Sequence, residues 1–243
     1  MQVVLLCAGM GTRLGSRTEA LPKTLLDLNG KAVLDHILKS VDLDEISDII
    51  VVGGFEIGKL KDHLEKYKGK PLRIVENPDY RDGSVLTVAK AMPFIEGDFI
   101  IMNGDHIHPR AMVHKFISEA RGIACATDRD RILTDDDMKV KLDASGAVSM
   151  MDKKLSDYDC GYIGVTFYAA SHLDLYRDYI QITLARHGYK SNVEKIVQCL
   201  ADDGYKPGVV DLSGFGWLEI DNEGDYRHAL EQIAVNPYLK RLV

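Results

Sequence analysis

The sequence predicts an α/β fold in which one domain is built on a mixed, mostly parallel sheet flanked by helices. Short apolar runs alternate with helical stripes roughly every 25 residues through the first half of the chain. The second half is less regular and contains a hairpin signal. No internal repeat, low-complexity tract or linker divides the 243 residues, so a single domain is the economical interpretation.

The first half predicts a parallel sheet. Helix 31–41 shows the pattern most clearly, because its apolar residues recur at positions 33, 34, 37, 38 and 41. Strands that alternate with helices in this way form parallel sheets with right-handed crossovers. The apolar runs predict strands at 3–7, 48–54, 72–76, 98–103 and 123–127, and the stripes predict helices at 31–41, 56–67, 84–92 and 109–121.

The second half predicts a sheet extension on the substrate side. Strands at 138–142 and 147–151 flank Ala144-Ser145-Gly146, which is typical of a hairpin. The apolar and basic tail, 235–243, suits docking on the protein's own core or on a second subunit, so a homo-oligomer is one alternative. The remaining patterns predict strands at 161–169, 208–212 and 217–220, and helices at 171–187, 192–203 and 223–234.

Composition indicates an ordinary globular protein. The hydrophobic fraction is 46%, and the net charge of −7 argues against a protein that coats nucleic acid. Four widely separated cysteines without a C-x-x-C pair predict reduced, mostly buried thiols and no structural zinc. No apolar stretch approaches the length of about 18 residues that crosses a bilayer, so we expect no membrane insertion and a cytoplasmic location.

The first strand leads into a glycine-containing loop with cationic side chains. Its residues are Gly9, Gly11, Thr12 and Arg13, and Pro22-Lys23 follows at the start of the next apolar segment. Glycine lets backbone N–H groups approach an anion, and the cations supply charge. Leu14 stands where the dinucleotide fingerprint requires glycine, and the Walker spacing is also absent. The stretch therefore predicts phosphate binding of another type.

Two further candidate sites follow strand ends, where open parallel sheets bind ligands. Asn77 with Gly83-Ser84 follows strand 72–76, and Asp105 follows strand 98–103. Asp221 is the expected partner of Asp105, although a residue between a strand and a helix is also a common helix cap. Two carboxylates suit Mg²⁺, and we favour this ion over a transition metal on His106 and His108.

Gly9 to Leu14 with Pro22-Lys23 resembles the G-x-G-[ST]-R-x…P-K signature of the nucleotidyltransferases that activate sugar phosphates and related phosphates. Gly104-Asp105-His106 and the segment 217–225 resemble the two metal-aspartate segments of the cytidylyltransferase branch, which includes enzymes acting on phosphocholine, phosphonates and inositol-1-phosphate. This resemblance runs through nearly the whole chain. It implies one Rossmann-like nucleotidyltransferase domain over residues 1–243, with a nucleotide-binding half at 1–130 and an acceptor-binding half at 131–243.

The resemblance implies a Mg²⁺-dependent cytidylyltransferase that joins CMP from CTP to a small phosphorylated alcohol and releases pyrophosphate. Its catalytic residues would be Lys23 on the α-phosphate and Arg13 on the leaving phosphates, and its metal ligands Asp105 and Asp221. The nucleophile is already anionic, so no general base is required. The nucleotide-binding residues implied are Ala8, Gly9, Gly11, Thr12, Asn77, Gly83, Ser84 and Asp105, and the acceptor-binding residues are Lys139, Lys153 and Tyr162.

The acceptor stays open at this stage. Residues 103–108 and 128–140 most resemble the inositol-1-phosphate enzymes, whereas Tyr162-Ile163-Gly164 is closer to the phosphocholine and phosphonate enzymes. One alternative is a sugar-1-phosphate nucleotidyltransferase that uses UTP, TTP or GTP. Another is a non-catalytic nucleotide-binding regulatory subunit, which is disfavoured because Lys23, Asp105 and Asp221 are all present.

Overall fold

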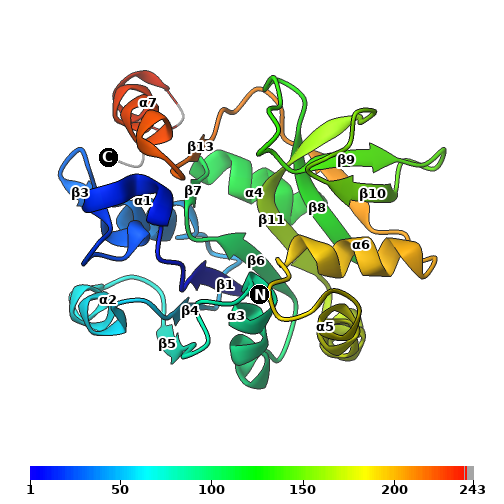
Figure 1. The fold of residues 1–243 in the computed structure, drawn as a ribbon, viewed down its shortest axis with the longest axis horizontal. Coiled ribbons are helices and arrows are strands. Elements are labelled where there is room, and N and C mark those ends of the chain that lie inside the picture. The colour runs from blue at the N-terminus through cyan, green and yellow to red at the C-terminus, as the bar shows by residue number, and fades with distance from the viewer. Residues whose placement is uncertain (238, 240–243) are drawn as a thin grey trace.

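The centre of the molecule is a mixed β-sheet with the strand order β10-β9-β11-β6-β1-β4-β5, in which β8 pairs with β11 and β12 pairs with β8. The computed structural model describes residues 1–237 and 239. Helices α1 and α2 lie at one end of the sheet and α6 lies at the other (Figure 1). The strands of this sheet are β1 (Gln2–Cys7), β4 (Asp48–Gly53), β5 (Leu72–Glu76), β6 (Phe99–Asn103), β8 (Ile123–Asp128), β9 (Lys139–Leu142), β10 (Val148–Asp152), β11 (Cys160–Tyr168) and β12 (Gly208–Asp211).

The first half of the chain forms the parallel part of the sheet. β1 lies between β4 and β6, and β5 continues the sheet beyond β4, all in parallel. Successive side chains of a strand point to opposite faces. Val3 and Leu5 therefore enter one core, while Val4 between them enters the other. A run of apolar residues without polar alternation thus becomes a strand that is buried on both faces.

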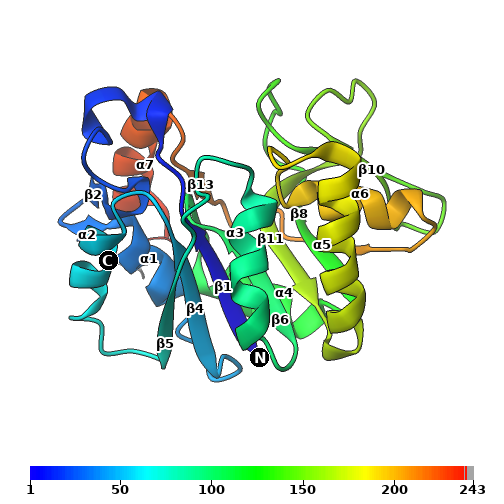
Figure 2. The same ribbon diagram turned by 60° about the horizontal axis from the view of Figure 1, so that its bottom comes forward.

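Helices cover both faces of this sheet (Figure 2). One core is closed by α1 (Val33–Ser40), α2 (Ile57–Leu64), α4 (Arg110–Glu119) and α7 (Glu223–Val235). The other core is closed by α3 (Ser84–Ala91), α5 (Leu173–His187) and α6 (Glu194–Asp202). Short 3₁₀ helices complete this set, namely η1 (Thr12–Arg17), η2 (Lys23–Leu25), η3 (Met92–Phe94) and η4 (Ala170–His172).

The second half adds the antiparallel part. β11 pairs antiparallel with β6, β8 and β9, and the expected hairpin is formed by β9 and β10. β12 returns to pair in parallel with β8. Two very short pairs lie outside the large sheet, β2 (Asp27–Leu28) with β3 (Lys31–Ala32) and β7 (His106–Ile107) with β13 (Leu218–Glu219).

The structure confirms the predicted fold class, a single α/β domain with a mixed sheet flanked by helices. The strand predicted at 72–76 is β5, a half-exposed edge strand, because it has a neighbour on one side only. All four cysteines are buried and free, as expected. In the described residues, no helix is both long and apolar enough to cross a membrane. Of the tail, residues 238 and 240–243 lie outside the described part of the chain.

Candidate active site

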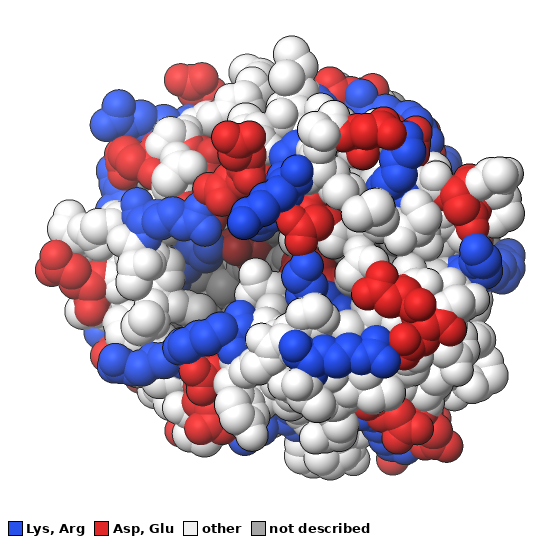
Figure 3. Space-filling model, turned by 45° about the vertical axis from the view of Figure 1, so that its right-hand side comes forward, with Lys and Arg blue, Asp and Glu red and all other residues white. Residues whose placement is uncertain are grey.

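A cavity of about 370 Å³ lies beyond the carboxyl ends of β1 and β6. These two strands are adjacent, and the amide of Gly104 donates to the carbonyl of Leu6, so the loops that follow them start side by side. The face drawn in Figure 3 is hollowed, and both basic and acidic side chains border the hollow. The volume suits a small ligand, and the position is the one that open parallel sheets use for binding.

The glycine-containing loop after β1 packs against the side chain of Lys23. Gly11 adopts a left-handed conformation with a φ of 66°, and a Cβ atom there would lie 2.9 Å from the Cβ of Lys23. Only glycine accepts both conditions. Downstream of this turn, Thr12 starts the 3₁₀ helix η1, whereas the sequence suggested an open loop. The turn brings Arg13 and Lys23 to the same cavity although they are separated in sequence.

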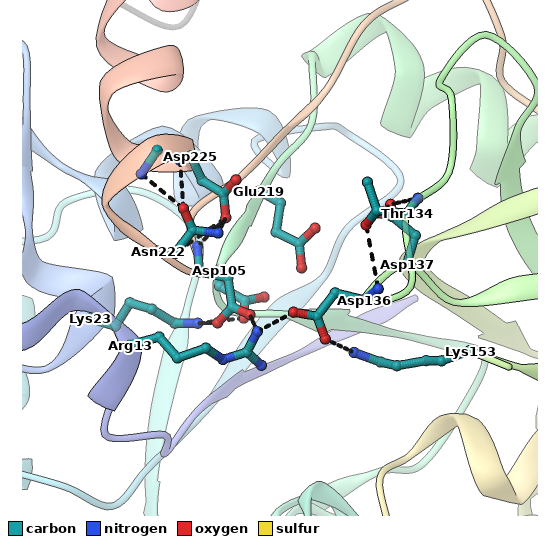
Figure 4. Close-up of polar contacts among 12 residues, drawn as sticks. Arg13, Lys23, Asp105, Thr134, Asp136, Asp137, Lys153, Glu219, Asn222 and Asp225 are labelled. Carbon is teal, nitrogen blue, oxygen red and sulfur yellow. Dashed lines mark hydrogen bonds and ion pairs between the residues drawn. The ribbon is translucent and has the colours of Figure 1, made fainter.

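Lys23 lies between the two predicted metal ligands, and Figure 4 shows its contact with Asp105. Its Nζ is 2.7 Å from Oδ2 of Asp105 and 3.0 Å from Oδ1 of Asp221, and only 11% of its side chain is exposed. Burial lowers the pKa of Lys23, but the two carboxylates outweigh burial and the pKa is raised. Burial likewise favours the neutral form of Asp105, yet Lys23 and His106 hold its pKa well below its usual range. This contact therefore keeps the lysine protonated and Asp105 ionised.

Asp221 is available for this contact because its neighbour caps the helix. The side chain of Asn222 accepts hydrogen bonds from the amides of Gly224 and Asp225 at the start of α7. Asp225 in turn accepts from the amides of Asp221 and Asn222, which completes a capping box. The alternative that Asp221 itself is the N-cap is therefore wrong, and its carboxylate faces Lys23 instead.

Arg13 extends the network toward the second half of the chain. Its Nη1 is 2.7 Å from Oδ2 of Asp221 and 2.7 Å from Oδ2 of Asp136, which lies between β8 and β9. The other oxygen of Asp136 is 3.4 Å from Nζ of Lys153. Six side chains thus alternate in charge across the cavity in the order Asp105, Lys23, Asp221, Arg13, Asp136 and Lys153 (Figure 4). We call this set the charge network.

Asp105 also contacts His106, which belongs to a stack of aromatic rings. His106 Nδ1 is 2.6 Å from Oδ1 of Asp105, and the His106 ring stacks on Trp217 with 5.2 Å between centroids. The guanidinium of Arg131 lies 4.8 Å from the centroid of the same indole. Burial lowers the pKa of His106, but Asp105 outweighs burial and raises it, which favours a charged hydrogen bond. Gly164 makes room for this ring, since a Cβ there would lie 2.8 Å from it.

Comparison with known proteins shows the family of this chain. The family model described as the MobA-like NTP transferase domain matches residues 3–204. The chain belongs to the MobA-like NTP transferase family. It is therefore an enzyme of the nucleotidyltransferase type, as the sequence motifs predicted.

The relatives of this transferase agree with the resemblance seen in its motifs. The chain is 27% identical over 232 residues to the bifunctional IPC transferase and DIPP synthase of Rubrobacter xylanophilus, which covers 94% of the chain and 51% of that relative. The chain thus spans about half the length of this curated relative. The inositol-1-phosphate CTP transferase of T. maritima has the same fold, with a TM-score of 0.81, 19% identity and 96% of each chain covered. The CTP:phosphocholine cytidylyltransferase of Streptococcus pneumoniae gives a TM-score of 0.76 at 22% identity, with 96% of this chain and 98% of that chain covered.

Most predicted site residues of this transferase line the cavity. They are Ala8, Gly9, Gly11, Thr12, Arg13, Lys23, Ser84, Asp105, Lys153, Tyr162 and Asp221. Tyr162 is nevertheless buried, with its hydroxyl hydrogen-bonded to Oγ1 of Thr166. Tyr162 therefore forms part of the cavity wall.

Three predicted residues lie outside the cavity lining. Asn77 is fully buried and donates to Oγ1 of Thr87, so its amide shapes the turn after β5. Gly83 packs against the backbone of Ser191, which a Cβ would overlap. Lys139 is buried, and its Nζ donates to the carbonyls of Thr134 and Lys153 at 2.6 and 2.7 Å. It contacts backbone rather than the cavity.

The structure also adds contacts that the motifs did not indicate. Asp136 joins Arg13 to Lys153, and Trp217 supports His106. The strand expected at 217–220 is β13, and its pairing with β7, which the sequence did not predict, places Glu219 opposite His106. Other lining residues come from the turn after β5 and the start of α6, namely Tyr80, Asp82, Asn192 and Glu194.

Proposed function

We propose that this chain is a cytidylyltransferase that transfers CMP from CTP to a phosphate or phosphonate oxygen of a small acceptor and releases pyrophosphate. The charge network is the observation that carries the proposal, because it places three cations and three carboxylates at the carboxyl ends of the strands. Phosphoryl chemistry of this kind depends on positioning and charge neutralisation. The names of the two solved structures with the same fold, which both include CTP, support CTP as the donor. A CTP-using enzyme with four buried thiols fits the cytoplasm.

The reaction balances without a general base. An anionic oxygen of the acceptor forms a bond to the α-phosphorus of CTP, and the bond from that phosphorus to the α,β-bridging oxygen breaks. The electron pair leaves with pyrophosphate, so no proton must be removed from the nucleophile. The barrier is the approach of like charges, which fixed cations lower.

The cations of the charge network fit the successive phosphates. Lys23 is the most buried of them, and in our proposal it binds the α-phosphate, where charge increases in the transition state. Arg13 has five donors on its guanidinium, so it binds the leaving phosphates and also shares the acceptor's anion with Lys153. The loop from Ala8 to Thr12 lies over the same cavity and supplies backbone contacts to the nucleotide. Lys153 binds the acceptor phosphate from the opposite wall.

The donor set of this site fits a divalent cation. Oδ2 of Asp105 and Oδ1 of Asp221 converge on one point, since both lie within 3.0 Å of Nζ of Lys23. Two carboxylates with phosphate oxygens and water form the hard-oxygen ligand set that Mg²⁺ takes in nucleotide sites. Bound there, Mg²⁺ would neutralise charge on the phosphates.

Pyrophosphate release tests the proposal. We expect release with Mg²⁺, CTP and one of a panel of acceptors: inositol-1-phosphate, phosphocholine, 2-aminoethylphosphonate, glycerol-3-phosphate and glucose-1-phosphate. Lys23→Ala should lower kcat by about 10²–10³, the usual cost of removing one transition-state contact. Lys115→Ala is the matched control, because Lys115 pairs with Glu119 on α4, outside the cavity lining.

Other outcomes contradict the proposal. Faster turnover with UTP, TTP or GTP and a sugar-1-phosphate would show that CTP is not the preferred donor. CTP binding without turnover across the panel, unaffected by Lys23→Ala, would indicate a non-catalytic nucleotide-binding subunit.

A further inference from the structure

Asp136 lies between two cations that belong to different halves of the chain. Its Oδ2 is 2.7 Å from Arg13 in η1, and its Oδ1 is 3.4 Å from Lys153, which follows β10. All three side chains line the cavity. A carboxylate that reaches two cations with its two oxygens has the geometry of a bound oxyanion.

The segment that carries Asp136 is fixed on both sides of it. Oδ2 of Asp137 accepts hydrogen bonds from the amide and hydroxyl of Thr134, which closes a turn around Asp136. The buried ammonium of Lys139 donates to the carbonyls of Thr134 and Lys153. Lys139 thus ties this turn to the backbone of Lys153, so the spacing between Asp136 and Lys153 is set by the fold.

The side chain of Asp136, in contrast, is held only by charge. It is 68% exposed, and among the described residues its carboxylate pairs with these two cations, so it can rotate into water without disturbing the turn. Lys153 and then Arg13 lower the pKa of Asp136, which keeps it ionised. Exposed ion pairs of this kind are weak, and a ligand with more charge can displace them.

We propose that Asp136 is an internal competitor for the acceptor's anion site and restricts that site to dianionic head groups. A phosphate monoester or phosphonate carries up to two negative charges and gains by replacing a single carboxylate between Arg13 and Lys153. A phosphodiester carries one charge, so the exchange brings it no electrostatic advantage. Asp136 is thereby a specificity-determining residue, and this role rests on the proposed function only in naming the anion as the acceptor's.

Anion binding to the free protein tests the inference without any turnover. Isothermal titration calorimetry at pH 8 and low salt compares inorganic phosphate, mostly a dianion, with dimethyl phosphate, a monoanion. Wild type should bind phosphate and show little binding of dimethyl phosphate. Asp136→Asn should bind phosphate about two- to thirtyfold more tightly, the range expected for the loss of two exposed ion pairs. It should also gain binding of dimethyl phosphate.

Two controls separate this effect from a change in net charge. Asp135→Asn removes the same charge at the neighbouring exposed position and should leave both affinities within about twofold of wild type. Lys153→Gln in the Asp136→Asn background removes one cation of the site and should cancel the gain. Thermal denaturation confirms that each variant is folded.

The results can overturn the inference separately from the proposed function. Equal or weaker phosphate binding by Asp136→Asn, or an equal gain in Asp135→Asn, overturns it. Binding of both anions by wild type with the same affinity also overturns it. Tighter binding by Asp136→Asn in a protein that makes no CDP-linked product sustains the inference and removes the proposed reaction.

Discussion

Replacing Lys23 by methionine isolates the contribution of one buried ammonium. Methionine keeps most of the aliphatic stem, so the change removes charge more than packing. In the structure Nζ is 2.7 Å from Asp105 and 3.0 Å from Asp221. The variant therefore leaves two carboxylates facing the same point with no cation between them.

The distances and exposures set the size of the effect. Removing one partner of a buried ion pair costs about 3–5 kcal/mol. The side chains of Asp105 and Asp221 are 24% and 20% exposed, so water screens part of their repulsion. We expect a loss of about 2–4 kcal/mol in the free energy of unfolding. At about 2–4 °C per kcal/mol for a chain of this length, Tm falls by about 4–16 °C.

Differential scanning calorimetry in EDTA measures the loss of stability, and the same measurement in Mg²⁺ shows whether the carboxylates bind the ion. The two carboxylates, which then converge with no ammonium between them, should take up Mg²⁺, so the ion should raise Tm more in Lys23→Met than in wild type. Lys115→Met is the control, with an expected change within about 0.5 kcal/mol and no altered response to Mg²⁺. A Tm equal to that of wild type in EDTA, or an equal response to Mg²⁺, refutes the reasoning.

Other substitutions probe the supports of the site. Gly11→Ala places a Cβ 2.9 Å from Lys23 at a φ of 66°, so it should lower both turnover and stability. Gly146→Ala, at a φ of 82° with open space around it, should cost only about 1–2 kcal/mol of stability. Steady-state kinetics and thermal denaturation of both variants measure this difference. Asp105→Asn should lower Mg²⁺-dependent turnover by about 10²-fold or more while the fold is kept, as pyrophosphate release and circular dichroism will show. Burial, and then the charge of His106, lower the pKa of His108 to about 3, below its usual value. Its contribution to stability is therefore complete above about pH 6.5 and is lost as pH falls, by up to about 1.4 kcal/mol per pH unit, so urea denaturation of His108→Phe should show a flatter acid limb.

The site residues that could be predicted from the sequence all follow local apolar patterns. Lys23 follows the glycine loop, and Asp105 follows a strand end, so local apolar patterns were enough to place both at the same edge of the sheet. Parallel strands bring their carboxyl ends together whatever the intervening helices contain. The central strands were equally predictable, because a strand buried on both faces is a continuous apolar run.

The residues that could not be predicted depend on contacts with no local pattern. Asp136 stands 123 positions from Arg13 in a polar segment without periodicity, so only the folded chain reveals their ion pair. Lys139 alternates with apolar neighbours in β9, and its burial is explained by two carbonyl acceptors that the sequence does not specify. The stack of Trp217 on His106 depends on a strand pair of two residues. The strand at 217–220 was predicted, but no local pattern indicated β7 or its pairing with β13.

The balance of charge in this network bears on how substrates enter it. Asp105, Asp221 and Asp136 offset Lys23, Arg13 and Lys153, so the six formal charges cancel before any ligand arrives. Under the proposed function, a nucleotide without a cation would draw Lys23 and Arg13 away, which leaves Asp221 unpaired and Asp105 with His106 alone, both partly buried, and this is costly. A cation without a nucleotide would displace Lys23 from the same carboxylates at a similar cost. A triphosphate and Mg²⁺ arriving together satisfy both sets at once, and an acceptor dianion then replaces Asp136 at the far end. The same self-neutralisation that stabilises the empty site therefore favours the complete set of substrates over any one of them.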